Sequence, residues 1–134
     1  MEHKHRKICP FFGKCGGCSL QHIPYEAQLS NKKQFIERLI KKFNIDFKGD
    51  IKIFSAKPYG YRNRMDFIFH KEGLGLRQKG SWKKVININQ CLISNEKLNL
   101  LLNEVRNFFN KNKNNLSLFD IISKRGCLRY AVIR

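Results

Sequence analysis

The chain has 134 residues, with 27 Lys or Arg against 10 Asp or Glu, which gives a formal net charge of +17. Its length fits one domain or part of one, and a hydrophobic fraction of 42% argues against intrinsic disorder. It contains no apolar run long enough for a membrane-spanning helix or a secretion signal. We therefore expect a cytoplasmic protein without membrane contact, and the excess of positive charge predicts a nucleic acid as its partner.

Three of the five cysteines fall within ten residues near the N-terminus: Cys9, Cys15 and Cys18. In a reducing compartment, clustered thiols are more often metal ligands than disulfides. The two glycines between Cys15 and Cys18 allow backbone amides to turn toward thiolate sulfur. An all-cysteine site needs a fourth ligand, for which the sequence offers three candidates: Cys91, Cys127 and His22. Since the second cysteine pair of a zinc ribbon is missing, the spacing favours an iron–sulfur cluster over zinc.

Helical and strand patterns follow the cysteine loop. A stripe of apolar residues from Tyr25 to Phe43 predicts a helix that faces a core, with Pro24 as its first residue. A short strand is expected over residues 51–54. The alternating segment 61–69 and the segments 74–77 and 82–88 predict three strands, which turns join into an antiparallel meander.

A second helix is expected after the meander, with Ser94 as its N-cap and an apolar stripe from Leu98 to Phe109. Two more strands are predicted over residues 116–122 and 128–133. This order predicts an α+β fold, in which an antiparallel β-meander is combined with two helices and an N-terminal cysteine-rich loop. Because the last strand has no return strand, we expect a truncated domain with an exposed sheet edge.

Basic side chains gather on the predicted meander and form the candidate RNA-binding surface: Arg62, Arg64, Arg77, Lys83 and Lys84. Such groups contact phosphates, and guanidinium planes also stack on unpaired bases. The lysines of the first predicted helix, such as Lys41 and Lys42, are expected to form a solvated helix face.

Six short motifs follow one another along the chain, at residues 9–22, 25–32, 61–64, 74–77, 85–91 and 128–134. In these motifs the chain resembles the iron–sulfur branch of the RNA (uracil-5-)-methyltransferases. The resemblance implies that Cys9, Cys15, Cys18 and Cys91 bind one [4Fe-4S] cluster. Cys127 has no matching role and is expected to be a small buried residue. The resemblance also implies a cluster-binding loop over residues 1–23 and a partial central α+β RNA-binding domain over residues 24–134.

Enzymes of this family attack carbon 6 of a uracil with a cysteine thiolate and methylate carbon 5 from S-adenosylmethionine. The domain that binds S-adenosylmethionine and carries the nucleophile has no counterpart in the 134 residues. We therefore expect the cluster-carrying, RNA-binding part of such an enzyme, which would modify rRNA or tRNA together with a separate polypeptide that supplies the methyltransferase half. Two alternatives stay open: a stand-alone zinc or iron–sulfur RNA-binding module without catalysis, and a nonfunctional gene fragment.

Overall fold

The computed structural model describes residues 8–134, which form two helices and a four-stranded sheet. The elements follow one another in this order: α1 (Tyr25–Lys42), β1 (Met65–His70), β2 (Gly73–Arg77), β3 (Val85–Asn87), α2 (Glu96–Asn112) and β4 (Tyr130–Ile133). The predicted α+β class is confirmed. In the part of the chain that the structure describes, neither helix is long and apolar enough to cross a membrane.

The strands of the sheet lie in the order β3-β2-β1-β4, and all neighbouring strands are antiparallel. The first three strands are the predicted meander, and β4 lies at the edge of the sheet beside β1. Met65 and Phe67 of β1 are buried, whereas Asp66 between them is exposed, so one face of β1 belongs to the core. β2 and β3 approach closely at Gly75, where a Cβ atom would lie 2.1 Å from the Ile86 carbonyl oxygen.

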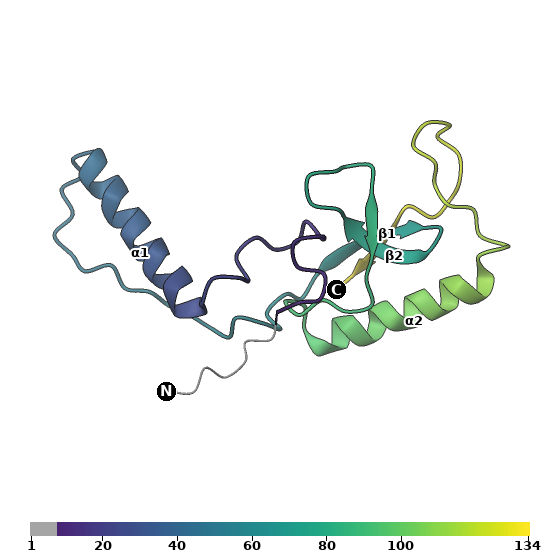
Figure 1. The fold of residues 1–134 in the computed structure, drawn as a ribbon, viewed down its shortest axis with the longest axis horizontal. Helices are drawn as coiled ribbons and strands as arrows, with labels where there is room; N and C mark the ends of the chain where they lie inside the picture. The colour runs from purple at the N-terminus through teal and green to yellow at the C-terminus, as the bar shows by residue number, and fades with distance from the viewer. Residues whose placement is uncertain (1–7) are drawn as a thin grey trace.

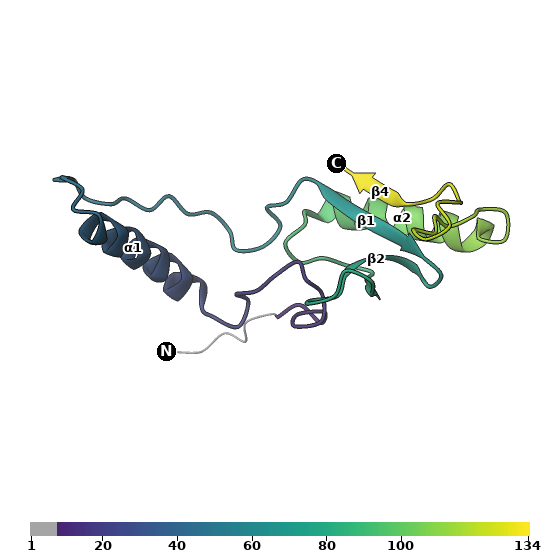
Figure 2. The same cartoon turned by 90° about the horizontal axis from the view of Figure 1, so that it is seen from above.

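Helix α2 packs against the sheet through contacts with β2 and β4 (Figure 2). Its buried residues are Leu98, Leu102 and Phe109, and the Phe109 ring lies 5.2 Å from the Phe69 ring of β1, centroid to centroid. The N-cap of α2 is Asn95 rather than the predicted Ser94, because the Asn95 side chain accepts a hydrogen bond from the Leu98 N–H at 2.8 Å.

Helix α1 extends away from the sheet, and the cysteine loop lies between the two (Figure 1). None of its residues is buried, and Phe35 remains 52% exposed. The helix forms as predicted, but the expectation that its apolar stripe faces a core is wrong. Helical periodicity determines which side chains share a face, but it does not supply a surface to cover that face.

Several predicted strands are shorter in the structure or absent from it. Residues 51–54 are irregular, and segment 116–122 contains only the isolated bridge between Leu118 and Leu128. β1 begins at Met65 instead of residue 61, because Arg62 pairs in parallel with Ser94 outside the sheet. Strand pairing depends on a neighbouring strand that local alternation does not reveal.

Candidate cluster-binding site

The four predicted ligand cysteines line one cavity. Cys9, Cys15 and Cys18 come from the N-terminal loop, and the buried Cys91 comes from the connection between β3 and α2. Most of the remaining wall is apolar: Phe11, Phe12, Met65, Leu76, Ile88, Leu92 and Ile93. All four cysteines are free thiols. The fold therefore brings together residues that lie more than seventy positions apart in the sequence.

Backbone hydrogen bonds hold the cysteine loop against the end of β2. The Gly16 N–H donates to the Arg77 carbonyl at 2.9 Å, and the Lys79 N–H donates to the Lys14 carbonyl at 2.7 Å. Cys15 lies between these bonds and forms an isolated antiparallel bridge with Gln78. This pairing orients the loop before any ligand binds.

The thiols that line this cavity affect one another's pKa. Burial raises the pKa of the Cys15 thiol, and negative charge on Cys91, Cys18 and Cys9 raises this pKa further. The Gly17 N–H opposes the shift by donating to Cys15 Sγ at 3.3 Å, which is the amide orientation expected from the glycines. Burial likewise raises the pKa of Cys18, and charge on Cys91 and Cys9 adds to it. A bound cation would relieve this repulsion.

Two side-chain amides position the cysteines. Gln21 Oε1 accepts a hydrogen bond from the Cys9 N–H at 3.0 Å, and the Gln21 side chain also hydrogen-bonds Cys18. Asn99 accepts from the Cys91 N–H at 2.8 Å and donates to the Cys91 carbonyl at 3.0 Å. Sequence reasoning did not single out either amide for this role. The Asn99 contact exists because the chain turns between Cys91 and the first turn of α2.

The donor set fits a [4Fe-4S] cluster, which takes four cysteine thiolates. Among residues 8–134, no group of three or more His, Cys, Asp or Glu side chains has the geometry for a single metal ion. The cavity measures about 20 Å³, which is room for roughly one water molecule. To admit a cluster, the four side chains would have to move outward.

The other two candidates for the fourth ligand lie outside this cavity. His22 is exposed, and its ring is 5.8 Å from the Phe12 ring, centroid to centroid. Cys127 is exposed, so the expectation that it is buried is wrong. It lies in the loop before β4, where its Sγ donates to the Ser117 carbonyl at 3.3 Å. A side-chain hydrogen bond from Ser117 lowers the pKa of this thiol.

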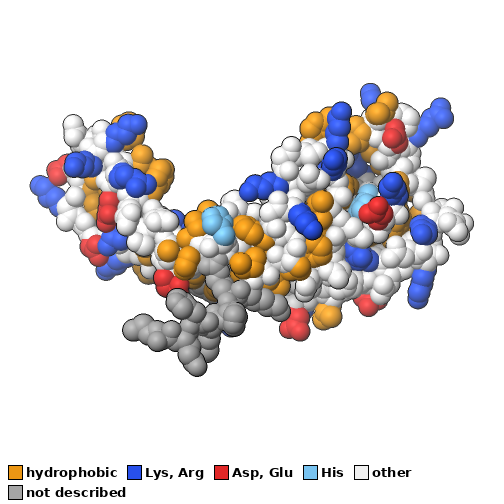
Figure 3. Space-filling view, in the orientation of Figure 1, with side chains coloured by type: hydrophobic (Ala, Val, Ile, Leu, Met, Phe, Trp, Pro, Cys, Tyr) orange, Lys and Arg blue, Asp and Glu red, His pale blue; other side chains and the backbone are white. Residues whose placement is uncertain are grey.

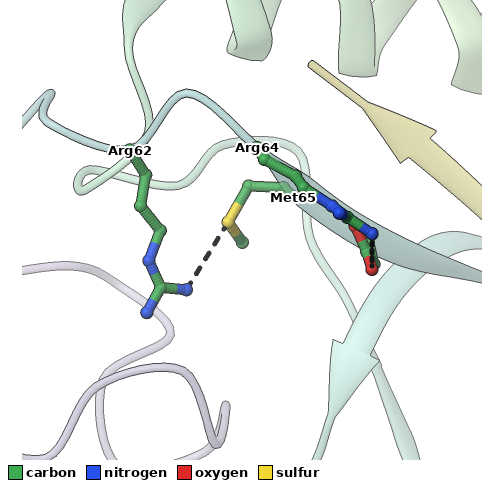
Figure 4. A network of polar contacts seen from close by, with 4 residues as sticks. Arg62, Arg64 and Met65 are labelled. Carbon is green, nitrogen blue, oxygen red and sulfur yellow. Dashed lines mark hydrogen bonds and ion pairs between the residues drawn. The ribbon is translucent and has the colours of Figure 1, made fainter.

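The five predicted RNA-binding residues differ in their surroundings. Arg62 points toward the cysteine loop, with its Nη1 3.7 Å from Met65 Sδ (Figure 4). Arg64 points elsewhere and donates to both carboxylate oxygens of Asp66, at 3.0 and 3.1 Å. The others follow along the meander: Arg77 is half-buried at the end of β2, and Lys83 and Lys84 are exposed in the turn before β3. Lys and Arg side chains are spread over both ends of the molecule (Figure 3).

Comparison with known proteins shows what the chain is similar to. The chain is 35% identical over 126 residues to the tRNA (uracil(54)-C(5))-methyltransferase of Pyrococcus abyssi, a match that covers 94% of this chain and 29% of that protein. The chain is a homologue of the RNA (uracil-C5)-methyltransferases. It is also 39% identical over 141 residues to an uncharacterized RNA methyltransferase of Clostridium tetani, covering 100% of this chain and 30% of that protein.

The fold agrees with this relationship. The crystal structure of the Pyrococcus abyssi tRNA (uracil-54, C5)-methyltransferase in complex with S-adenosyl-L-homocysteine matches with a TM-score of 0.68 and 30% sequence identity. The match covers 87% of this chain and 27% of that one. No family model matches the chain. The chain thus spans about 30% of the length of the methyltransferases that it resembles.

Proposed function

We propose that the chain is the cluster-carrying, RNA-binding part of an S-adenosylmethionine-dependent RNA (uracil-C5)-methyltransferase, which makes 5-methyluridine in rRNA or tRNA. The similarity to RNA methyltransferases along 94–100% of the chain carries this proposal. The solved relative was crystallised with S-adenosyl-L-homocysteine, the product that remains after S-adenosylmethionine gives up its methyl group. The net charge of +17 supports RNA as the substrate.

In this proposal, Cys9, Cys15, Cys18 and Cys91 hold one [4Fe-4S] cluster. The observation that supports this assignment is a cavity lined by the four thiols and mostly apolar side chains. Each of the four cysteines would bind one iron of the cluster through its thiolate. When bound, the cluster would join the N-terminal loop to the connection between β3 and α2, which is a structural role.

In the same proposal, the basic residues of the meander contact the RNA backbone: Arg62, Arg64, Arg77, Lys83 and Lys84. S-adenosylmethionine and the nucleophile belong to the parts of such an enzyme that this chain does not span. A separate polypeptide carrying those parts would complete it.

RNA binding by the purified chain tests the first half of the proposal. The affinity for tRNA or an rRNA fragment should fall steeply with salt, because each phosphate neutralised by Lys or Arg releases counterions. Lys83→Ala combined with Lys84→Ala should weaken binding more than Lys41→Ala combined with Lys42→Ala, which removes the same charge from α1. Equal losses from the two pairs would indicate diffuse charge and contradict a binding surface on the meander.

Methyl transfer tests the second half. The 134-residue chain with labelled S-adenosylmethionine should not methylate any RNA, whereas adding a polypeptide that carries the remaining parts should give 5-methyluridine. Methylation by the chain alone would overturn the proposal. A stable chain that does not bind the added polypeptide would favour the stand-alone module. A single bound zinc ion would favour the zinc form of that module.

A further inference from the structure

A second, open cavity adjoins the cysteine site. It lies between the end of the cysteine loop, the first turns of α1 and residues 56–61, and its volume of about 580 Å³ is in the range of small-molecule sites, roughly 300–1,000 Å³. Three tyrosines and two lysines stand out among the residues that line it: Tyr25, Tyr59, Tyr61, Lys32 and Lys57. We call this cavity the tyrosine groove.

The charge of the tyrosine groove differs from that of two other open cavities. Its described lining contains two lysines and no carboxylate. The cavity between α1 and residues 44–51 combines Lys41 with three acidic residues: Glu37, Asp46 and Asp50. The cavity beside the start of α2 contains Glu96 and no Lys or Arg. Of these three cavities, only the tyrosine groove combines positive charge with aromatic rings and no opposing carboxylate.

We propose that the tyrosine groove binds a single-stranded segment of the RNA substrate, with bases stacked on its tyrosine rings and phosphates beside Lys32 and Lys57. The inference rests on the proposed function and adds a site outside the basic meander. Aromatic side chains flanked by basic residues are the usual means of holding unpaired bases, because every base has a flat face for stacking. A duplex conceals those faces and would not enter the groove.

The walls of the groove are fixed to the loops that carry the cysteines. On one side, the Gly60 N–H donates to the Leu92 carbonyl at 2.9 Å, and the Arg62 N–H donates to the Ile93 carbonyl at 2.8 Å. These bonds tie the segment that carries Tyr59 and Tyr61 to the residues just after Cys91.

On the other side, Cys18 and Gln21 line both the tyrosine groove and the cysteine cavity. Gln28 of α1 donates from Nε2 to the carbonyls of Leu20 and Ile23, at 3.0 and 2.9 Å, and fixes the start of the helix to the same loop. The groove is therefore a built feature of the cysteine site and not a gap between independent parts.

Tyr61 is the best residue to test, because its side chain is 58% exposed and its removal leaves no cavity in the core. The full chain would be titrated with a fluorescent single-stranded oligonucleotide of about ten nucleotides and with its duplex. Tyr61→Ala should weaken single-strand binding about 5- to 150-fold, the range of one lost base stack, and change duplex binding less than twofold. Tyr61→Phe keeps the ring and should bind like the wild type.

Two matched controls distinguish the groove from general surface effects. Phe108→Ala removes a 62% exposed ring from α2 and should leave single-strand affinity unchanged. Lys32→Ala combined with Lys57→Ala should lower the log–log salt slope by about 1.4, at roughly 0.7 for each phosphate contact on a single strand. Lys41→Ala combined with Lys42→Ala should leave the slope unchanged.

The outcomes separate the groove from the proposed function. If the wild type binds RNA with a steep salt dependence but Tyr61→Ala binds as well as Phe108→Ala, the groove assignment is wrong and the proposed function stands. Failure of the wild type to bind RNA at any salt concentration would overturn both. Circular dichroism of each variant excludes misfolding, and the Tyr61→Phe variant provides a folded reference.

Discussion

The unit formed by the sheet and α2 has a buried core, whereas the arm formed by α1 and residues 43–58 does not (Figure 1). Both helices carry an apolar stripe of similar length, yet Leu102 and Phe109 of α2 are 0% and 2% exposed, while Phe43 after α1 is 65% exposed. The difference lies in the facing surface. α2 lies on β2 and β4, whereas no residue of α1 is packed closely enough against residues 8–134 to be buried.

The contacts that hold the arm are correspondingly few. Lys33 of α1 forms an ion pair with Asp50 at 3.1 Å, and the Asp50 side chain is 74% exposed. Exposed pairs of this kind contribute about 0.2–1 kcal/mol. We expect the arm to open at a lower free energy than the unit of sheet and α2, because local stability follows buried apolar contact.

The largest expected effect separates these two regions directly. Phe67→Ala in β1 removes a side chain that is 1% exposed and should lower the free energy of unfolding by about 3–5 kcal/mol. Phe35→Ala in α1 removes the same ring from a 52% exposed position and should change it by roughly 0.5 kcal/mol or less. Urea unfolding monitored by circular dichroism measures both, and similar losses would contradict the division.

A polar contact gives the next largest effect. Arg106 of α2 donates from Nη1 to Asn87 Oδ1 at 2.6 Å and to the Leu74 and Ile88 carbonyls, and so joins α2 to the strands. Arg106→Leu leaves these acceptors without this donor and should cost about 1.5–3 kcal/mol of unfolding free energy. Lys33→Ala, which removes the ion pair of the arm, should cost less than about 1 kcal/mol. Thermal unfolding of the two variants under one buffer condition provides the comparison.

The N-caps of the two helices also differ, because the α1 cap at Pro24 makes no side-chain hydrogen bond. Asn95→Ala removes the cap of α2 and should cost about 1 kcal/mol. Ser94→Ala should be close to neutral, since the buried Ser94 Oγ has no hydrogen-bond partner among the described residues. If Ser94→Ala were the more destabilising of the two in urea unfolding, the cap assignment would be wrong.

The smallest expected effect is a dependence of the free energy of unfolding on pH, through His70 of β1. Burial lowers the pKa of His70 below its ordinary 6.5, and Arg106 and Lys71 lower it further against the opposing charge of Glu72. The native state then binds fewer protons than the unfolded state below about pH 6.5, so the free energy of unfolding should fall as the pH drops from 7 toward 5. Replacing His70 with Gln should flatten this part of the profile, and an unchanged slope would show that other groups cause it.

Periodicity predicted both helices and the three-stranded meander, because these elements are encoded in neighbouring residues. It failed where tertiary partners decide, as in the exposed stripe of α1 and the missing strand at residues 51–54. Spacing alone left Cys91, Cys127 and His22 open as the fourth ligand, and only the family resemblance selected Cys91. The Asn99 contact could not be predicted, because it joins segments whose approach the fold decides.

The central claim is that Cys9, Cys15, Cys18 and Cys91 form one cluster site between the two regions, and its most direct test is metal analysis of anaerobically purified protein. We predict about four irons and four sulfides per chain, with broad absorption near ~400 nm. Cys91→Ser should lose this absorption and Cys127→Ser should keep it. One zinc and no iron per chain, or loss of the absorption in Cys127→Ser but not in Cys91→Ser, would contradict the account.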